Sequence, residues 1–309
     1  VRYVGVATAS GMSGRHVGDR FSFDYCTTDY RELLEDEDVQ AVFVLTRHGS
    51  HAHFTKEALR AGKAVFVEKP LALNRQELTE VVRAWQAGSG FLMEGLNRRF
   101  APTTRFVTDR LHTERGSLIV HCRCNAGHIP ADSWVHDPEQ GGGRIIGEAC
   151  HFVDLVQALT SGLPVEVYVA ATEGSGGHLR DNLTCSLKMD NGSAGSIIYT
   201  SQGDKSFPRE YVEVFGHGAV ATIQNFRSAT FTRNGNTSRK RGFLSVDRGH
   251  VDEMKAFFQH LRKGESQPIP MREYVATALA TFAMEASIAQ GKPIAVDADR
   301  FLQESLGAG

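Results

Sequence analysis

Lys69 is the residue whose type and position best suit proton transfer, because an ammonium group can donate a proton. It follows four apolar residues at 64–67, a run that predicts a short buried strand. Pro70 must end that strand because proline has no N–H for the sheet, and a bond before proline can be cis. Ligands of open parallel sheets bind at the carboxyl ends of strands, so we expect Glu68 and Lys69 at the mouth of a site. The competing interpretation is a surface Glu68–Lys69 pair that closes a strand.

His151 is the second candidate, because imidazole titrates near neutral pH. It lies in an apolar stretch at about 147–160 that predicts a helix, where a lone histidine is often structural. Asp154 lies about one helical turn later and could orient His151 or bind a substrate hydroxyl. Cys150 points about 100° away from His151 on a helix, so we expect an inert buried thiol there.

A polar segment between these two candidates contains His128, His136 and Asp137. These residues could line a substrate pocket or lie in a solvated loop. With His151 they could also suggest a metal site, but their spacing matches no strong ligand motif. We therefore expect no bound metal.

Strands and helices alternate through residues 1–100, and residues 9–14 are expected to form a loop. Capping boxes mark helix starts, as at Asn74 and Glu77. This alternation predicts an α/β domain with a Rossmann-like parallel sheet. Strands are expected at 2–8, 23–27, 41–45, 64–67 and 91–96, and helices at 29–35, 51–61 and 74–87.

Consecutive strand-like runs without crossover helices follow, which predicts an α+β domain with a mainly antiparallel open sheet. We place the boundary where the alternation ceases: residues 1–102 bind the nucleotide, and residues 103–309 bind substrate and form oligomer contacts. Strands are expected at 118–124, 165–172, 183–189, 193–201, 211–215 and 219–223, and helices at 147–160, 250–262 and 272–290.

The composition excludes several classes of protein. A net charge of -2 over 309 residues, with both signs interspersed, argues against nucleic-acid or membrane-surface binding. No apolar run reaches the roughly 18 residues of a membrane span. Five scattered cysteines fit reduced thiols in a cytoplasmic protein.

Alternating apolar residues in the segment 182–201 predict an oligomer. We expect them on faces of the sheet that need cover, and helices can cover only one face of a sheet. We therefore expect a homo-oligomer that packs through the second sheet. The residues are Leu183, Cys185, Leu187, Met189, Ile197 and Tyr199.

Several separated motifs resemble the Gfo/Idh/MocA family of nicotinamide-dependent sugar and cyclitol oxidoreductases. Residues 125–139 look closest to the branch whose dehydrogenase module is fused behind a zinc-type alcohol-dehydrogenase-like domain. Residues 46–51 are similar to the family's Thr-Pro-Asn-x-x-His loop, with Arg47 and His48 in place of Pro and Asn. Residues 67–72 are similar to its Glu-Lys-Pro signature. The remaining motifs are residues 97–100, and residues 141–143 followed by His151 and Asp154.

Two departures from the family pattern matter. Members open with a strand and a Gly-x-Gly-x-x-Gly turn that holds the pyrophosphate, and no such turn precedes the strand at 2–8. We therefore expect an N-terminally truncated domain in which the strands at 2–8 and 41–45 either pair directly or leave the sheet open. Gly147 stands where the family usually has an Asp, and Glu148 points about 100° away from that position.

The resemblance implies that Lys69 and His151 share proton transfer while a hydride moves to or from the nicotinamide of NAD(P). It implies a small, polyhydroxylated substrate. The implied cofactor-binding residues are Thr8, Ser10, Arg15, Thr46, Arg47, His51, Glu68, Lys69 and Asn97. The implied substrate-binding residues are Asn125, His128, Trp134, His136 and Asp154.

The loop at 8–15 contains no carboxylate, which favours NADP over NAD because NAD sites place an acidic residue on the ribose. The competing class is a non-catalytic fragment of this fold that acts as a binding or interaction module. The missing glycine turn and Gly147 favour that class, whereas Lys69 and His151 oppose it.

Overall fold

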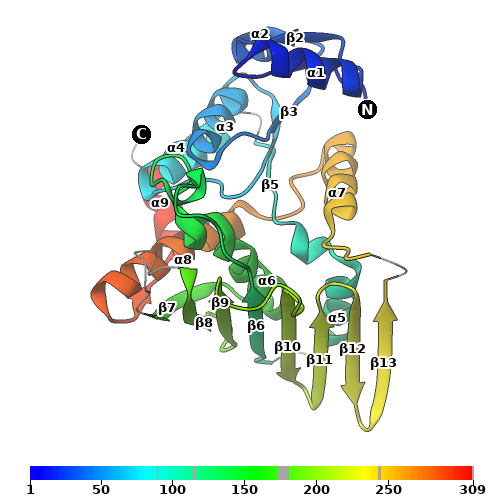
Figure 1. Ribbon diagram of the computed structural model, residues 1–309, viewed down its shortest axis with the longest axis vertical. Coiled ribbons are helices and arrows are strands. Elements are labelled where there is room, and N and C mark those ends of the chain that lie inside the picture. Colours follow the sequence, from blue (N-terminus) through cyan, green and yellow to red (C-terminus); the bar gives the residue numbers. More distant parts are fainter. Residues whose placement is uncertain (89, 114–115, 173–180, 243–244, 308–309) are drawn as a thin grey trace.

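The computed structural model describes residues 1–88, 90–113, 116–172, 181–242 and 245–307. Its first part contains parallel strands with helices between them (Figure 1), as predicted. The strands are β1 (Gly5–Ala7), β2 (Tyr25–Thr27), β3 (Ala41–Val44), β4 (Ala64–Val67) and β5 (Leu92–Glu94). The helices are α1 (Gly11–Phe21), α2 (Tyr30–Glu35), α3 (His51–Arg60) and α4 (Arg75–Ala87).

The parallel strands form two sheets, with order β1-β2 in one and β3-β4-β5 in the other. In the part of the chain that the structure describes, β1 and β3 are not paired, so the sheet is open at this point rather than closed by direct pairing. Phe43 and Leu45, in and just after β3, are 36% and 64% exposed.

The expected loop at 9–14 is wrong in part, because α1 begins at Gly11. Ser10 caps this helix by accepting a hydrogen bond from the Ser13 backbone N–H at 3.3 Å. Gly14 and Gly18 are its buried residues, and a Cβ at Gly18 would lie 2.2 Å from Cys26 Sγ in β2. These glycines indicate close helix–strand packing, not the loop that we inferred from them.

All four residues of β4 are buried, as their apolar character predicts. The Lys69–Pro70 peptide bond is cis, as expected. Immediately after it, the Leu71 backbone N–H donates to Glu94 Oε1 at 3.0 Å, which ties the chain after β4 to the end of β5. This connection fixes where Glu68 and Lys69 emerge from the sheet.

The second part is built on a sheet of nine strands in the order β13-β12-β11-β10-β6-β9-β8-β7-β14. It is mainly antiparallel, but β6 and β9 are parallel neighbours. The strands are β6 (Ile119–Asn125), β7 (Pro164–Ala171), β8 (Leu183–Met189), β9 (Ala194–Thr200), β10 (Glu210–Gly216), β11 (Ala219–Gln224), β12 (Ser228–Arg233), β13 (Asn236–Arg241) and β14 (Ile294–Ala295). The helices are α5 (Pro102–Leu111), α6 (Cys150–Thr160), α7 (His250–Lys263), α8 (Met271–Gln290) and α9 (Ala298–Gly307).

Helices α5, α6 and α8 lie on one side of this sheet and bury its inner face (Figure 1). Among the described residues, none of the helices combines the length and hydrophobicity that crossing a bilayer requires. The described cysteines are all free thiols.

The assignment of apolar residues to two faces of the sheet is wrong. Leu183 pairs directly with Tyr199, and Cys185 pairs with Ile197. Paired residues point to the same side of a sheet, so all of these side chains lie on the helix-covered face and are buried in the single chain. The homo-oligomer stays a prediction, and it cannot rest on these residues.

Candidate functional site

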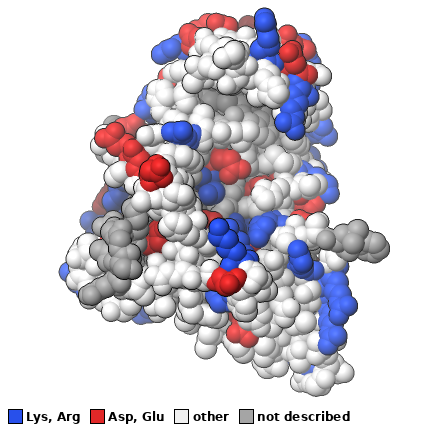
Figure 2. Space-filling view, viewed as in Figure 1, with Lys and Arg blue, Asp and Glu red and all other residues white. Residues whose placement is uncertain are grey.

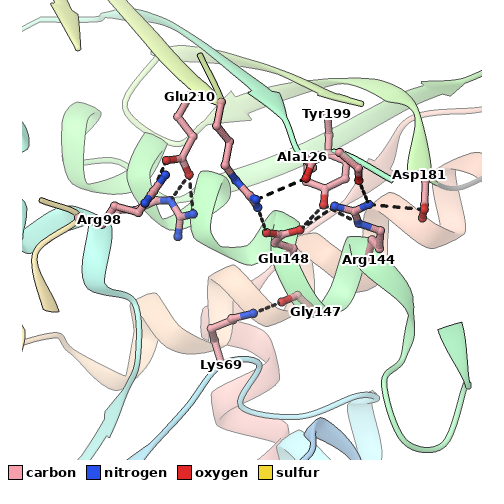
Figure 3. A network of polar contacts seen from close by, with 12 residues as sticks. Lys69, Arg98, Ala126, Arg144, Gly147, Glu148, Asp181, Tyr199 and Glu210 are labelled. Atoms are coloured by element: carbon pink, nitrogen blue, oxygen red, sulfur yellow. Dashed lines mark hydrogen bonds and ion pairs between the residues drawn. The ribbon is translucent and has the colours of Figure 1, made fainter. Parts of the chain in front are cut away.

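Lys69 is partly buried at the carboxyl end of β4. Its Nζ donates a hydrogen bond to the carbonyl oxygen of Gly147 at 2.6 Å (Figure 3). Gly147 lies in a π-helical turn, Ile145–Ala149 (η4), that leads into α6 about one turn before His151. The structure therefore brings Lys69 beside the segment that carries His151, whereas the roles of both residues stay predictions.

His151 is 6% exposed, and its Nδ1 is buried without a hydrogen-bond partner among the described residues. Burial lowers the pKa of His151 well below its usual value, and the positive charges of Arg98 and Lys69 lower it further. The ring is therefore uncharged at pH 7. An uncharged imidazole can form a hydrogen bond to a substrate oxygen, but it carries no additional proton to donate as an acid.

His48 also contacts this turn, although no sequence pattern assigns it a role. Its Nδ1 lies 2.8 Å from the carbonyl oxygen of Gly141. A carbonyl can only accept, so Nδ1 carries the proton and Nε2 keeps a lone pair. A Cβ at Gly147 would lie 2.7 Å from His48 Cε1, so the imidazole occupies the space that a side chain at 147 would need. Burial lowers the pKa of His48 to about 4, which keeps the ring neutral.

Asp154 is fully buried, and its carboxylate is already engaged within the protein. Its Oδ1 accepts a hydrogen bond from Arg99 Nε at 3.0 Å, and Arg99 Nη1 donates to Glu273 at 2.7 Å. In this structure Asp154 anchors Arg99. Contact with a substrate hydroxyl, the role we predicted, would require this ion pair to open.

Glu148 shows why the residue next to Gly147 does not replace the family's Asp. Its carboxylate points away from Lys69 and accepts hydrogen bonds from Arg144 at 3.2 Å, from Arg209 and from Tyr199 (Figure 3). Although burial alone would raise the pKa of Glu148, these partners hold it below its usual range.

Glu210 is a second buried carboxylate that two arginines share. Arg98 Nη2 donates to its Oε1 at 2.6 Å, and Arg248 Nε donates to its Oε2 at 2.6 Å. Glu210 is 1% exposed, and the two arginines hold its pKa low despite burial. We call these linked ion pairs the arginine network, which consists of Arg98, Arg144, Glu148, Arg209, Glu210 and Arg248.

Two buried carboxyl groups, Glu94 and Glu253, lie near Glu68. Burial raises the pKa of Glu94 to about 8 and that of Glu253 to about 9, so both are protonated at neutral pH. Glu94 Oε2 and Glu253 Oε1 are buried without partners among the described residues. Figure 2 shows Lys, Arg, Asp and Glu side chains around a hollow in this face of the molecule.

The predicted cofactor residues lie at the carboxyl ends of the parallel strands. Thr8 follows β1, and the exposed Thr46 and Arg47 follow β3. His51 is fully buried, with Nδ1 2.9 Å from the Pro70 carbonyl and Nε2 2.9 Å from the Thr46 carbonyl, so it holds the two strand ends together.

The remaining predicted cofactor residues differ in exposure. Ser10 and Arg15 are exposed on α1, Glu68 is partly buried beside Lys69, and Asn97 is buried. Asn97 Nδ2 donates to the Arg248 carbonyl at 3.0 Å. Accessible polar groups after β1, β3 and β4 fit a dinucleotide that lies across this edge.

Seven residues of the segment 131–140 line a groove that Arg47 completes: Ala131, Asp132, Ser133, Trp134, His136, Asp137 and Gln140. Trp134 packs against the His48 ring at 4.9 Å between centroids, and Arg47 lies over Trp134 at 5.4 Å. Of the predicted substrate residues, Trp134 and His136 line this groove, His128 is exposed outside its lining, and Asn125 is buried. Among the described residues, no group of three or more His, Cys, Asp or Glu side chains is placed to hold a metal ion.

Comparisons with known proteins agree with this architecture. The family model described as "Oxidoreductase family, NAD-binding Rossmann fold" matches residues 2–96, and the one described as "GFO/IDH/MocA C-terminal domain" matches residues 117–222. The uncharacterized oxidoreductase YrbE of Bacillus subtilis is 26% identical over 90% of this chain and 84% of its own length. Myo-inositol 2-dehydrogenase of Thermotoga maritima is 21% identical over 92% of this chain and 87% of its own length.

Solved structures show the same fold at lower sequence identity. Levoglucosan dehydrogenase in complex with NADH and levoglucosan superposes with a TM-score of 0.85 and 19% identity. The superposition covers 96% of this chain and 90% of that chain.

Proposed function

Because this chain belongs to the Gfo/Idh/MocA family of NAD-binding oxidoreductases, we propose that it interconverts a hydroxyl and a carbonyl group on a polyhydroxylated small molecule. The bound nicotinamide cofactor supplies the hydride acceptor or donor. The observation that carries the proposal is the position of Lys69, whose Nζ lies at the carboxyl end of β4 and 2.6 Å from the Gly147 carbonyl.

Lys69 is the proposed proton carrier. In the oxidative direction its unprotonated amine takes the proton of the substrate hydroxyl as the C–H hydride leaves, and in the reductive direction its ammonium returns that proton to the oxygen. The Gly147 carbonyl accepts a hydrogen bond from Nζ and so fixes the direction of the side chain. His151, uncharged at neutral pH, positions the same substrate oxygen through its imidazole.

A sugar or cyclitol is the proposed class of substrate. Relatives named for such activities include the myo-inositol 2-dehydrogenase above and an inositol 2-dehydrogenase of Rhizobium meliloti, which is 25% identical over 96% of this chain. Trp134 and His136 in the groove supply an apolar face and a polar ring, a combination that suits a sugar.

NADP is the proposed cofactor. Ser10, Ser13 and Arg15 lie at the start of α1, where the structure places hydroxyls and a cation but no carboxylate from residues 8–15. A ribose 2′-phosphate would be better accommodated there than a free 2′-hydroxyl. Homo-oligomerisation through the second sheet and a cytoplasmic location remain part of the proposal.

Calorimetric titration of the purified chain with NADPH and NADH tests this function. We expect both to bind, with NADPH the tighter ligand. A panel of sugars and cyclitols would then be screened for reduction of NADP⁺. Absence of binding by either dinucleotide would favour the non-catalytic alternative, and tighter binding of NADH would refute the cofactor preference alone.

A further inference from the structure

The substrate side of the site contains more cationic than anionic groups. The arginine network has four guanidinium groups and two carboxylates, and Asp181, 3.8 Å from Arg144, adds a third carboxylate among the described residues. Lys69 adds a further cation whose Nζ bonds to a carbonyl, and the neighbouring Glu68 adds a fourth carboxylate, which leaves one cation in excess. Charged groups that leave water are normally balanced by partners of opposite sign, so this surplus calls for an anion.

Two arginines of the network, Arg209 and Arg248, reach the solvent, whereas Arg98 and Arg144 are buried. Side chains of Arg209 and Arg248 are 37% and 26% exposed, whereas Glu210 is 1% and Glu148 20% exposed. Glu148 and Glu210 are therefore less exposed than the two arginines that they hold in place, Arg209 and Arg248. A molecule in the hollow would meet positive charge first.

The two exposed arginines, Arg209 and Arg248, also have N–H donors that make no hydrogen bond among the described residues. A guanidinium group has five N–H donors. Among the described residues, Arg248 uses only its Nε–H, towards Glu210, and Arg209 uses Nη2 towards Glu148 with a long 3.4 Å contact from Nη1 to the Ala126 carbonyl. Guanidinium groups with free N–H pairs bind carboxylates and phosphates in a two-pronged geometry.

The lowered pKa of His151 also reflects the positive charges around it. Burial is the main cause of its lowered pKa, and the charges of Arg98, Lys69, His250 and Arg209 all add to it. Its Nδ1 is buried and unpartnered among the described residues. A bound anion would compensate these charges around the catalytic centre.

We assign this anion to the substrate and not to the cofactor's pyrophosphate, because Arg209 and Arg248 lie next to other elements than the strands of the dinucleotide edge. Arg98 lies in the 3-10 turn Asn97–Phe100 (η2), Arg209 precedes β10 and Arg248 precedes α7. The dinucleotide edge is formed by the ends of β1, β3 and β4 instead.

We propose that the substrate bears an anionic group, a carboxylate or a phosphate, which Arg209 and Arg248 bind while Lys69 and His151 face the reacting hydroxyl. The proposal rests on the proposed function and narrows its substrate class to charged sugar or cyclitol derivatives.

The test compares three probes that share one ring, D-glucuronate, D-glucose 6-phosphate and neutral D-glucose, in calorimetric titrations of the chain saturated with NADP⁺. We expect at least one charged probe to bind ten-fold or more tightly than glucose, and this preference to weaken as salt increases. Which charged probe binds distinguishes a carboxylate from a phosphate.

Substitutions of Arg209 and Arg248 test whether these arginines cause the preference for a charged probe over glucose. Arg209→Gln and Arg248→Gln should each lower affinity for the charged probe ten-fold or more and leave glucose unchanged, and Arg209→Lys should restore part of it. Arg300→Gln, an exposed arginine on α9, is the matched control. Thermal midpoints and NADP⁺ affinity check that each variant folds. If Arg209→Gln does not fold, Arg248→Gln alone tests the proposal.

Two outcomes would overturn the proposal: NADP⁺ binds but no charged probe is preferred over glucose, or the preference persists in both folded glutamine variants. Failure of NADP⁺ itself to bind would instead contradict the proposed function.

Discussion

At the scale of single residues, His48 and Gly147 form a matched pair that neither motif indicates alone. The imidazole packs where a Cβ at 147 would stand, and Lys69 Nζ bonds to the carbonyl of the same glycine. A side chain at 147 would therefore displace His48, the Lys69 hydrogen bond, or both.

We expect Gly147→Ala to destabilise the protein by about 1 to 3 kcal/mol through overpacking against His48. His48→Ala should relieve this, so the double variant should be more stable than the sum of the single effects, with a coupling of about 1 kcal/mol or more. Chemical denaturation of all four proteins measures the coupling. Additive effects would show that the two residues do not contact each other.

Glu253 gives a prediction for pH. Its folded pKa, raised to about 9, lies above the unfolded value, so the folded state keeps a proton that the unfolded state loses between about pH 4.5 and 9. Stability must fall with rising pH across that window, by at most roughly 1.4 kcal/mol per pH unit from this group. Glu253→Gln should remove part of this slope and raise the thermal midpoint most at pH 8 to 9. An unchanged slope in Glu253→Gln would show that Glu253 ionises normally, and Glu265→Gln, at an exposed site, is the control.

The sequence indicated the candidate site only where short motifs carry the information. Glu-Lys-Pro located Lys69, and the glycine-led helix located His151. Three further residues could not be found in this way, because they come from separate loops and their contacts depend on tertiary packing. His48 contacts Gly147, Arg209 contacts Glu148, and Arg248 contacts Glu210.

At the scale of elements, two loops meet backbone to backbone at Gly49. Its N–H donates to the Gln140 carbonyl at 2.9 Å, and a Cβ there would lie 1.9 Å from the Glu139 carbonyl oxygen. This contact joins the loop after β3 to the groove segment 131–140, so it positions His48 against Trp134.

We expect Gly49→Ala to force these loops apart, at a cost of about 1 to 3 kcal/mol or more, because a backbone carbonyl cannot rotate away as a side-chain end can. Gly11→Ala is the matched control, since nothing lies within 4 Å of a Cβ at that helical position. Denaturant midpoints compare the two. Equal stability of both variants would mean that the loops do not touch as described.

Elements with strong patterns were predicted and weakly patterned ones were not. The Asn74–Glu77 capping box begins α4 as expected, with the Glu77 N–H bonded to Asn74 Oδ1 at 2.9 Å. By contrast, every residue of β13 is exposed, so no apolar alternation marks it, and α1 was missed because its glycines read as a loop. The missed strands and helices are β12, β13, β14, α1, α5 and α9.

At the scale of the whole molecule, the uncovered face of the large sheet exposes apolar side chains in neighbouring strands. Ile119 is paired with Phe215, and Phe215 with Val220; they are 61%, 41% and 37% exposed. Adjacent exposed apolar residues on an open sheet suit a partner sheet of the same kind.

We expect Ile119→Lys combined with Phe215→Lys to convert the proposed homo-oligomer into a monomer, because like charges would face each other across the interface. Light scattering at micromolar concentration gives the mass of each protein. Lys188→Met, which removes a charge from an exposed position on β8, should not weaken assembly. A monomeric unsubstituted chain would refute the oligomer.

Lys69 carries the proton in the proposed reaction, and Lys69→Met tests this role most directly. With the substrate found by the screen and saturating cofactor, turnover should fall about 100-fold or more, the size of the effect of a lost acid–base group. Lys188→Met is the control and should keep full turnover. If Lys69→Met keeps its turnover within a few-fold of that of the unsubstituted chain, Lys69 does not carry the proton.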